Sequence, residues 1–234
     1  MEAWIGELIG TAILVFMGTA VVANVILKDT KGHGSGLIVI TSGWAMAVMI
    51  PAIIFGEISG SHFNPALTLA LAIAGDFSWS YVPLYIIGQM AGGIIGAALT
   101  WLFYRDHFNV TEDQGAQLAV FSTGPAIRNT FQNFISEFIG TFILVFMLMG
   151  LGNQPFADGL NFFGVGGIIM AIGVSLGGTT GYAINPARDL GPRIAHFLLP
   201  MKNKGDSDWS YAWLPVVAPI LGAICAALVA NVLF

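Results

Sequence analysis

The sequence predicts an all-α membrane protein with six transmembrane helices and two half-helices, arranged as an inverted repeat. The first observation behind this prediction is composition: 56% of the residues are hydrophobic and 9% are charged, whereas soluble domains have about 45–50% and about 25%. The second is the presence of six apolar stretches long enough to cross a bilayer. The third is an internal repeat, in which both halves carry an Asn-Pro-Ala segment at matching places.

Charge and cysteine content exclude several classes of function. The chain has 8 basic and 13 acidic residues and a net charge of −5, so it offers no basic surface to a nucleic acid. Its single cysteine, Cys225, excludes an intramolecular disulfide and a cysteine-based metal site. The apolar stretches contain neither a nucleophile–base pair nor a cluster of metal ligands. We therefore expect no enzyme, no cofactor and no metal site.

The six stretches are free of Asp, Glu, Lys and Arg. Each is close to or longer than the roughly 20 residues that a transmembrane helix needs. They cover residues 8–27, 32–56, 77–104, 138–155, 160–177 and 209–234. Buried helices of a soluble protein would require a charged exterior that 9% charged residues cannot supply. We expect one domain over residues 1–234, with a first repeat over about 1–104, a central loop over about 105–130 and a second repeat over about 131–234.

The two halves share two sequence patterns. Residues 7–17 recur as residues 137–147 with two differences, at an offset of 130. Residues 60–66 are echoed by residues 181–187, at an offset of 121. Each half then holds three spans, and because three is odd, the second half must enter the membrane from the opposite side. Such an inverted repeat places a solute site near the bilayer midplane.

Each Asn-Pro-Ala segment is predicted to start a half-helix. Asn is a favoured N-cap, and Pro at the first helical position loses nothing by lacking an N–H. The apolar run after the first copy, residues 66–74, covers only about half of a ~30 Å hydrocarbon core. The two copies are Asn64, Pro65 and Ala66, and Asn185, Pro186 and Ala187.

Two half-helices that enter from opposite faces would meet near the midplane with their N-termini together. Both positive dipole ends would then repel cations at the centre of a pore, where Asn64 and Asn185 would present amide donors. Non-helical backbone before each half-helix is tolerated at membrane depth where it faces protein or a water-filled cavity. Its carbonyls would line the pore at Gly60, Ser61 and His62, and at Gly181, Tyr182 and Ala183.

With these two motifs, the second extended to Asn-Pro-Ala-Arg-Asp by Arg188 and Asp189, the chain resembles the aquaporin and aquaglyceroporin family and, within it, the bacterial glycerol facilitators. The likeness covers nearly the whole chain. It implies a multi-pass protein of the cell membrane, and a homotetramer in which each subunit has its own pore. It also implies that both termini lie in the cytoplasm.

The implied orientation conflicts with the distribution of basic residues. With the termini inside, the basic residues outside the apolar stretches and half-helices all lie on the external side, which is the reverse of the positive-inside rule. They are Lys28, Lys31, Arg105, Arg128, Lys202 and Lys204. The motif match is the more specific signal, and the expected orientation follows it.

The resemblance also implies a four-residue selectivity filter at Trp44, Gly173, Tyr182 and Arg188. Arg188 is a permanently charged donor that can bind two hydroxyls at once. Trp44 and Tyr182 would form an apolar wedge for a carbon backbone, and Gly173 would leave space beside it. Glycerol facilitators typically carry Phe where this chain has Tyr182, and the added hydroxyl predicts a smaller, more polar opening.

Glu7 and Glu137 occupy equivalent places in the two halves. Intramembrane carboxylates often mark a proton relay, which would make the chain a proton-coupled secondary transporter. The resemblance implies instead that they hold the extended pore segments by hydrogen bonds. We therefore expect a passive channel for small uncharged solutes, namely glycerol, water, other small polyols and protonated small acids such as lactic acid.

Overall fold

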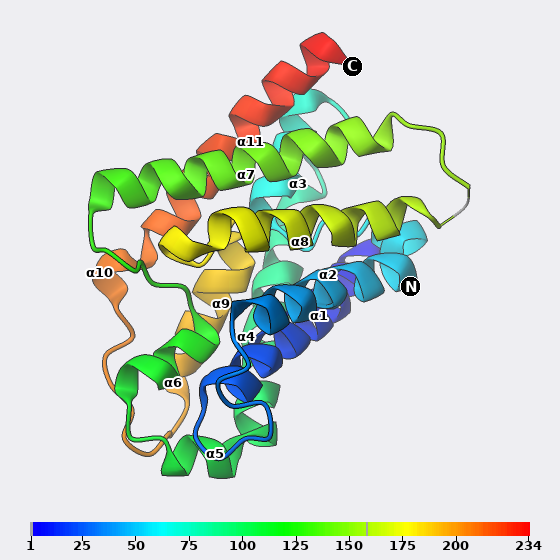
Figure 1. The fold of residues 1–234 in the computed structure, drawn as a ribbon. Coiled ribbons are helices and arrows are strands. Elements are labelled where there is room, and N and C mark those ends of the chain that lie inside the picture. The colour runs from blue at the N-terminus through cyan, green and yellow to red at the C-terminus, as the bar shows by residue number, and fades with distance from the viewer. Residues whose placement is uncertain (1, 158) are drawn as a thin grey trace.

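The computed structural model describes residues 2–157 and 159–234, and within these residues it has six helices long and apolar enough to cross a membrane. The predicted six spans are thereby confirmed. The first half contributes α1 (Ala3–Ile26), α2 (Leu37–Ser59) and α4 (Val82–Phe103). The second half contributes α7 (Thr130–Gly152), α8 (Asn161–Thr180) and α11 (Leu214–Leu233), the last preceded by the short α10 (Trp209–Ala212) (Figure 1).

Several boundaries differ from the charge-free stretches. α1 begins before Glu7 and α7 begins before Glu137, and both glutamates are fully buried. A buried carboxylate with hydrogen-bond partners does not end a transmembrane helix, so a boundary placed at the charge is wrong. Residues 32–36 and 77–81 lie within the predicted apolar stretches but form turns and irregular backbone ahead of α2 and α4.

The segment between the halves is more ordered than a plain loop. It contains α5 (Arg105–Val110) and α6 (Gln114–Phe121). Asp113 caps α6, because its side chain accepts a hydrogen bond of 3.0 Å from the N–H of Ala116. α6 lies against α9 and α1, so the connecting segment packs on the bundle.

Two glycines at repeat-equivalent positions make equivalent close contacts between helices. A Cβ added at Gly92 on α4 would collide with the carbonyl oxygen of Leu8 on α1. A Cβ added at Gly222 on α11 would collide with the carbonyl oxygen of Phe138 on α7. Both pairs are related by the offset of 130 seen in the sequence. The first and third spans of each half therefore approach closely through small residues, as is common in membrane helices.

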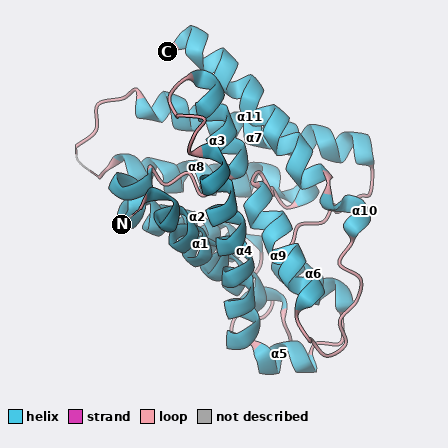
Figure 2. Ribbon diagram, turned by 180° about the vertical axis from the view of Figure 1, so that it is seen from behind, coloured by secondary structure: helices cyan, strands magenta, loops and turns pink. Residues whose placement is uncertain are grey.

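The half-helices α3 (Pro65–Ala74) and α9 (Pro186–Leu198) cross between the halves. α3 packs on α11 of the second half, and α9 packs on α4 of the first half (Figure 2). At the second contact, a Cβ at Gly93 would lie 2.6 Å from the carbonyl oxygen of Ala187. Each half thus fixes the start of the other half's helix, which brings the two N-termini together inside the molecule.

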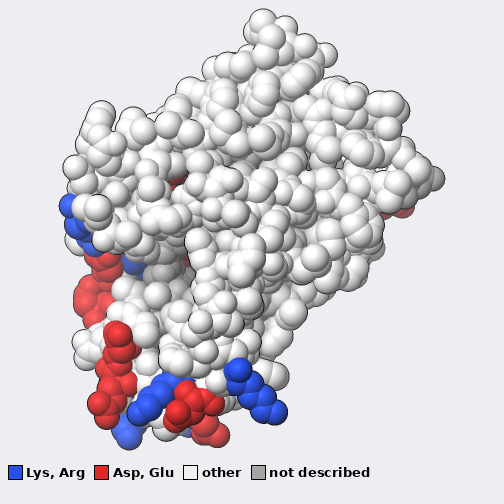
Figure 3. All heavy atoms as spheres, viewed as in Figure 1, with Lys and Arg blue, Asp and Glu red and all other residues white. Residues whose placement is uncertain are grey.

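The surface is apolar around the long helices and charged at one end. Charged side chains gather beside α5 and α6, while most of the face formed by the long helices is uncharged (Figure 3). Large apolar side chains are exposed there, among them Ile87, Leu102, Phe163 and Val217. An exposed apolar belt of this kind suits contact with lipid.

Candidate channel site

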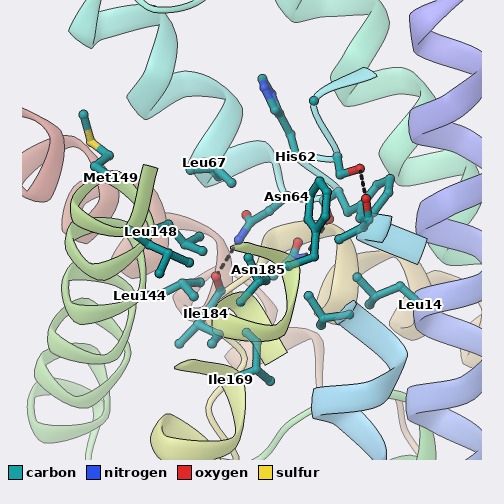
Figure 4. A pocket seen from close by; sticks show the side chains of 18 of the residues that line it. Leu14, His62, Asn64, Leu67, Leu144, Leu148, Met149, Ile169, Ile184 and Asn185 are labelled. Carbon is teal, nitrogen blue, oxygen red and sulfur yellow. Dashed lines mark hydrogen bonds between the residues drawn. The ribbon is translucent and has the colours of Figure 1, made fainter. Parts of the chain in front are cut away.

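A cavity of about 500 Å³ lies between the two halves and reaches both Asn-Pro-Ala motifs (Figure 4). Its lining combines apolar side chains with polar groups. The apolar lining includes Leu14, Val48, Leu67, Leu144, Leu148 and Ile169. The lining also includes the extended backbone and motif asparagines of residues 60–64 and 182–185, together with Arg188, Asp76, Asn153 and Asn161. Both repeats therefore contribute apolar and polar residues to the lining.

At its centre, each asparagine binds the backbone of the opposite half. Asn64 Nδ2 donates to the carbonyl oxygen of Ile184 at 2.9 Å, and Asn185 Nδ2 donates to that of Phe63 at 2.8 Å (Figure 4). The Oδ1 atom of each asparagine caps its own half-helix, accepting from Ala66 N and Ala187 N at 2.9 Å. The two helix starts are consequently linked by a reciprocal pair of hydrogen bonds.

The backbone before each asparagine has an unusual conformation. Ser61 and Phe63 have φ of 53° and 49°, and the repeat equivalents Tyr182 and Ile184 have φ of 41° and 45°. None of these is glycine, and left-handed φ is especially unfavourable for a β-branched residue such as Ile184. Conformations of this kind cost about 1–3 kcal/mol each and persist where the surroundings fix them.

Glu7 holds the first strained segment. Its carboxylate accepts hydrogen bonds from the N–H of His62 at 3.0 Å and of Phe63 at 2.7 Å. It also accepts from Ser59 Oγ and from Gln89 Nε2, both at 2.7 Å. The side chain is fully buried, and it lies outside the cavity lining. Both carboxylate oxygens are therefore engaged in fixing backbone.

Glu137 does the same in the second half. It accepts from the N–H of Ala183 at 3.0 Å and of Ile184 at 2.9 Å, and from Thr180 Oγ1 at 2.7 Å. This side chain is also fully buried and outside the cavity lining. The contacts favour the positioning role for both glutamates over a proton relay, because neither carboxylate meets the path that a solute would follow.

Three of the four expected filter residues meet at the cavity. Trp44, Tyr182 and Arg188 line it, and the guanidinium carbon of Arg188 lies 3.9 Å from the centroid of the Trp44 ring. Such stacking stabilises a cation over an aromatic face. Arg188 Nη1 also donates to the carbonyl oxygen of Phe121, at 3.4 Å. The guanidinium is thus held from two sides.

Gly173, the fourth expected filter residue, is placed behind Tyr182 and outside the cavity lining. A Cβ at Gly173 would lie 3.0 Å from Tyr182 Cζ, and a Cβ at Gly177 would lie 2.7 Å from Tyr182 Cδ1. The tyrosine ring fills the notch that these two glycines leave on α8. Its hydroxyl is buried without a partner among the described residues, so it adds no polar group to the cavity surface.

The remaining expected pore residues divide between the lining and its support. Gly60, Ser61, His62 and Ala183 line the cavity, whereas Gly181 lies behind it, near Thr123. Pro65, Ala66, Pro186 and Ala187 are buried in the half-helix starts. Phe63 and Ile184 are not among the predicted pore residues, although their carbonyls bind the asparagines and each directly precedes a motif asparagine.

A polar cluster beside the first motif was also missed. The His62 side chain lines the cavity, with Nδ1 3.1 Å from Thr68 Oγ1, and Gln89 Nε2 donates to the same oxygen at 2.9 Å. Gln89 is fully buried within α4. An isolated glutamine in an apolar transmembrane stretch was the available signal, since a polar group there needs a partner.

Residues 1–230 match the sequence profile of the Major intrinsic protein family. The chain belongs to this family. It is 51% identical to the probable glycerol uptake facilitator protein of Thermotoga maritima over 234 residues, covering 100% of both chains. It is 54% identical to the glycerol uptake facilitator protein of Bacillus subtilis, covering 100% of this chain and 85% of that one.

Among solved structures, the aquaglyceroporin from Plasmodium falciparum superposes with a TM-score of 0.87 at 29% identity, covering 98% of this chain and 94% of that one. As a Major intrinsic protein, the chain is a multi-pass membrane channel with the aquaglyceroporin fold, and not an enzyme.

Proposed function

We propose that this chain is a passive channel for small uncharged solutes in the cell membrane, with glycerol as its main solute. The observation that carries the proposal is the mixed lining of the cavity, in which apolar side chains lie together with the two motif asparagines, Arg188 and the extended backbone before each half-helix. A polyol suits such a lining, because its hydroxyls can form hydrogen bonds with the polar groups and its carbons can contact the apolar side chains. The relatives from Thermotoga maritima and Bacillus subtilis, which are named as glycerol uptake facilitators, support the same solute.

Water and other small polyols are proposed to pass by the same path, as are small acids in their protonated form. Ions are excluded, because removing an ion from water costs far more than removing a neutral molecule. Arg188 and the N-termini of α3 and α9 add a positive potential that opposes cations. The carbonyls of the extended segments oppose anions. This combination selects solutes by charge before it selects them by size.

Glycerol flux into proteoliposomes tests the proposal. After a glycerol gradient is imposed, light scattering is expected to show rapid equilibration downhill, at a rate unchanged by a protonophore or by an imposed proton gradient. Liposomes without protein give the lipid leak. Accumulation of glycerol above its external concentration would show a coupled transporter and would overturn the channel proposal.

Replacing Gly177 with Ala is expected to lower glycerol permeability by roughly tenfold, as an added barrier of about 1.4 kcal/mol would do. The new Cβ would lie 2.7 Å from Cδ1 and 2.9 Å from Cε1 of Tyr182. The ring must then move out of its notch toward the cavity, and forced repacking of this kind typically costs about 1–3 kcal/mol. Water permeability should fall less, because water is smaller. Stopped-flow light scattering measures both.

Gly178→Ala is the matched control for this change. Gly178 follows on the same helix, and apart from the local backbone of that helix no described atom lies within 4 Å of its added Cβ. It should keep wild-type permeability to both solutes. A second change that shortens the side chain, Tyr182→Leu, should restore glycerol flux to the Gly177→Ala variant. Wild-type flux in the properly folded Gly177→Ala variant would show that the position of the Tyr182 ring does not limit passage.

We also propose that the termini lie in the cytoplasm and that the chain forms homotetramers in the bilayer, with one pore in each subunit. Asn231 Nδ2 donates to the carbonyl oxygen of Ala74 at 3.1 Å, which puts the end of α3 beside the end of α11. The turn after α3, with exposed Asp76, would then be cytoplasmic, and the exposed Lys202 after α9 would be external.

Single cysteines introduced into a Cys225→Ala background test the orientation. In intact cells, a membrane-impermeant maleimide is expected to label Lys202→Cys and to leave Asp76→Cys unlabelled. Both positions should label after the cells are broken, which controls for reactivity. Labelling of Asp76→Cys alone in intact cells would reverse the proposed orientation and agree with the positive-inside rule.

A further inference from the structure

The half-helix that carries Arg188 also carries a fully buried ion pair. Arg193 Nη2 lies 2.9 Å from Asp189 Oδ1, and both side chains have 0% exposure. The repeat-equivalent residues on α3 are Leu67, Thr68 and Ala72, in place of Arg188, Asp189 and Arg193. The ion pair therefore occurs only in the half-helix that carries Arg188, and not in its repeat equivalent α3. Because a buried ion pair must overcome a large desolvation penalty, its presence is not explained by stability alone.

The pair binds two segments at the charged end of the molecule. Asp189 Oδ2 accepts hydrogen bonds from the N–H and from Oγ1 of Thr123, both at 2.7 Å. Arg193 Nη2 donates to the carbonyl oxygen of Thr123 at 2.9 Å, and Nη1 donates to that of Ser207 at 2.8 Å. The backbone at Thr123 is thus held through both its donor and its acceptor.

Residues 121–123, which we call the strap, connect the Asp189–Arg193 ion pair to Arg188. The strap starts at Phe121, the last residue of α6, whose carbonyl oxygen accepts the hydrogen bond from Arg188 Nη1. The Phe121 ring is fully buried, with centroids 5.5 Å from those of both Phe108 and His196. Thr123 is only two positions from Phe121, so a shift of the Thr123 backbone is expected to reach the carbonyl that faces the guanidinium.

We propose that Asp189 and Arg193 are positioning residues for Arg188. Their ion pair fixes the strap, the strap fixes the Phe121 carbonyl, and that carbonyl holds the Arg188 guanidinium over Trp44. The width of the opening beside Arg188 is then set by two residues that lie outside the cavity lining. The inference rests on the proposed function in one respect, namely that solutes pass Arg188.

The ratio of glycerol to erythritol permeability in proteoliposomes tests the inference, because erythritol is a larger polyol of the same chemistry. Asp189→Asn removes the charge that holds Arg193, and Thr123→Val removes one of the two bonds from the strap to Asp189. Both changes are expected to shift the ratio, by about fivefold for Asp189→Asn and less for Thr123→Val. In an Arg188→Ala background the same changes should leave the ratio unaltered, because the residue being positioned is gone.

A merely structural role for the pair would give a different result. It would reduce the amount of folded protein, with and without Arg188, and leave the permeability ratio of the folded fraction at its wild-type value. Thr123→Val decides the question if Asp189→Asn does not fold, since the bond from the Thr123 N–H to Asp189 remains. A wild-type ratio in folded Thr123→Val, or an equal shift in the Arg188→Ala background, would overturn the inference.

Arg128→Gln is the matched control. It breaks an ion pair at the same end of the molecule, between Arg128 Nη1 and Asp208 Oδ2 at 2.6 Å, whose side chains are 50% and 25% exposed. Exposed pairs contribute little to stability, and this variant should keep the wild-type ratio. Wild-type protein that passes no glycerol above the lipid leak would refute the proposed function itself. Normal wild-type flux with unshifted variants would refute the positioning role alone.

Discussion

Uptake of labelled lactic acid into proteoliposomes that carry this protein is expected to rise close to a hundredfold when the pH falls from about 7 to about 5. The acid has a pKa near 4, by analogy with side-chain carboxyls, so its neutral fraction rises from about a thousandth to about a tenth. Only the neutral form should pass, because a lactate ion would lose far more hydration energy on entering the cavity than a neutral molecule does, and the carbonyls of the extended segments are expected to oppose the attraction of the anion to Arg188. The measured quantity is the initial rate at fixed total acid, after the leak through protein-free liposomes is subtracted.

Glycerol flux at the same two pH values is the control, and it should stay constant. A parallel rise in glycerol flux would mean that the channel itself responds to pH. Lactic acid flux that follows the total acid, or that changes with membrane potential, would show that the anion permeates. Either of the last two results would refute the proposal that the cavity selects neutral solutes.

The features that sequence alone predicted well depend on short-range signals. α3 starts at Pro65 and α9 at Pro186, each capped by the preceding asparagine. Capping needs a side chain and a backbone N–H two residues apart, so the motif contains nearly all the information. The repeat offset then placed the two helix starts at equivalent positions in the two halves.

The parts that sequence did not predict depend on contacts between distant residues. The carbonyls of Phe63 and Ile184 accept from asparagines more than 100 positions away, with sequence separations of 122 and 120. Their left-handed backbone is imposed by Glu7 and Glu137, not by any local preference of Phe or Ile. Charge was also misleading at the helix boundaries, because these two glutamates are satisfied inside the helices that they were expected to delimit.

The orientation of the Tyr182 side chain could not be predicted from the sequence motif either. Its place in the expected filter with Arg188 was implied by the family resemblance, but the direction of its hydroxyl depends on how the ring packs. Because Gly173 and Gly177 leave a notch on α8, the ring lies in that notch and its hydroxyl is buried. The extra hydroxyl of Tyr182, compared with a Phe at this position, therefore changes the opening less than its size and polarity suggest. The spacing of the two glycines on one helix face was the available signal.

The second large effect is expected from Glu137→Ala, which should abolish the folded channel. The change would leave the buried N–H groups of Ala183 and Ile184, and the hydroxyl of Thr180, without their acceptor. Each buried unpaired group costs about 1–3 kcal/mol, so three of them approach the ~5–15 kcal/mol by which a typical domain is stable. The strained φ of Tyr182 and Ile184 would also lose the contact that maintains it. Size-exclusion chromatography in detergent and glycerol flux measure the loss.

Glu57→Ala is the control, because Glu57 is an exposed glutamate on α2. It should behave as wild type. A Glu137→Ala variant that folds and conducts glycerol normally would show that the carboxylate is dispensable for holding the second extended segment.

Glu7→Ala should be the milder of the two repeat-equivalent changes. Gln89 lies beside Glu7, and its Oε1 atom is buried without a partner among the described residues. Rotation of this amide would turn an acceptor toward the donors that Glu7 leaves behind. At the offset of 130 the second half has Pro219, which offers no such group. Because of this difference, Glu137→Ala should lose more folded channel than Glu7→Ala. Combining Gln89→Leu with Glu7→Ala should make the loss as large as that of Glu137→Ala. If the two single variants were equally damaged, the glutamine would not be acting as a substitute acceptor.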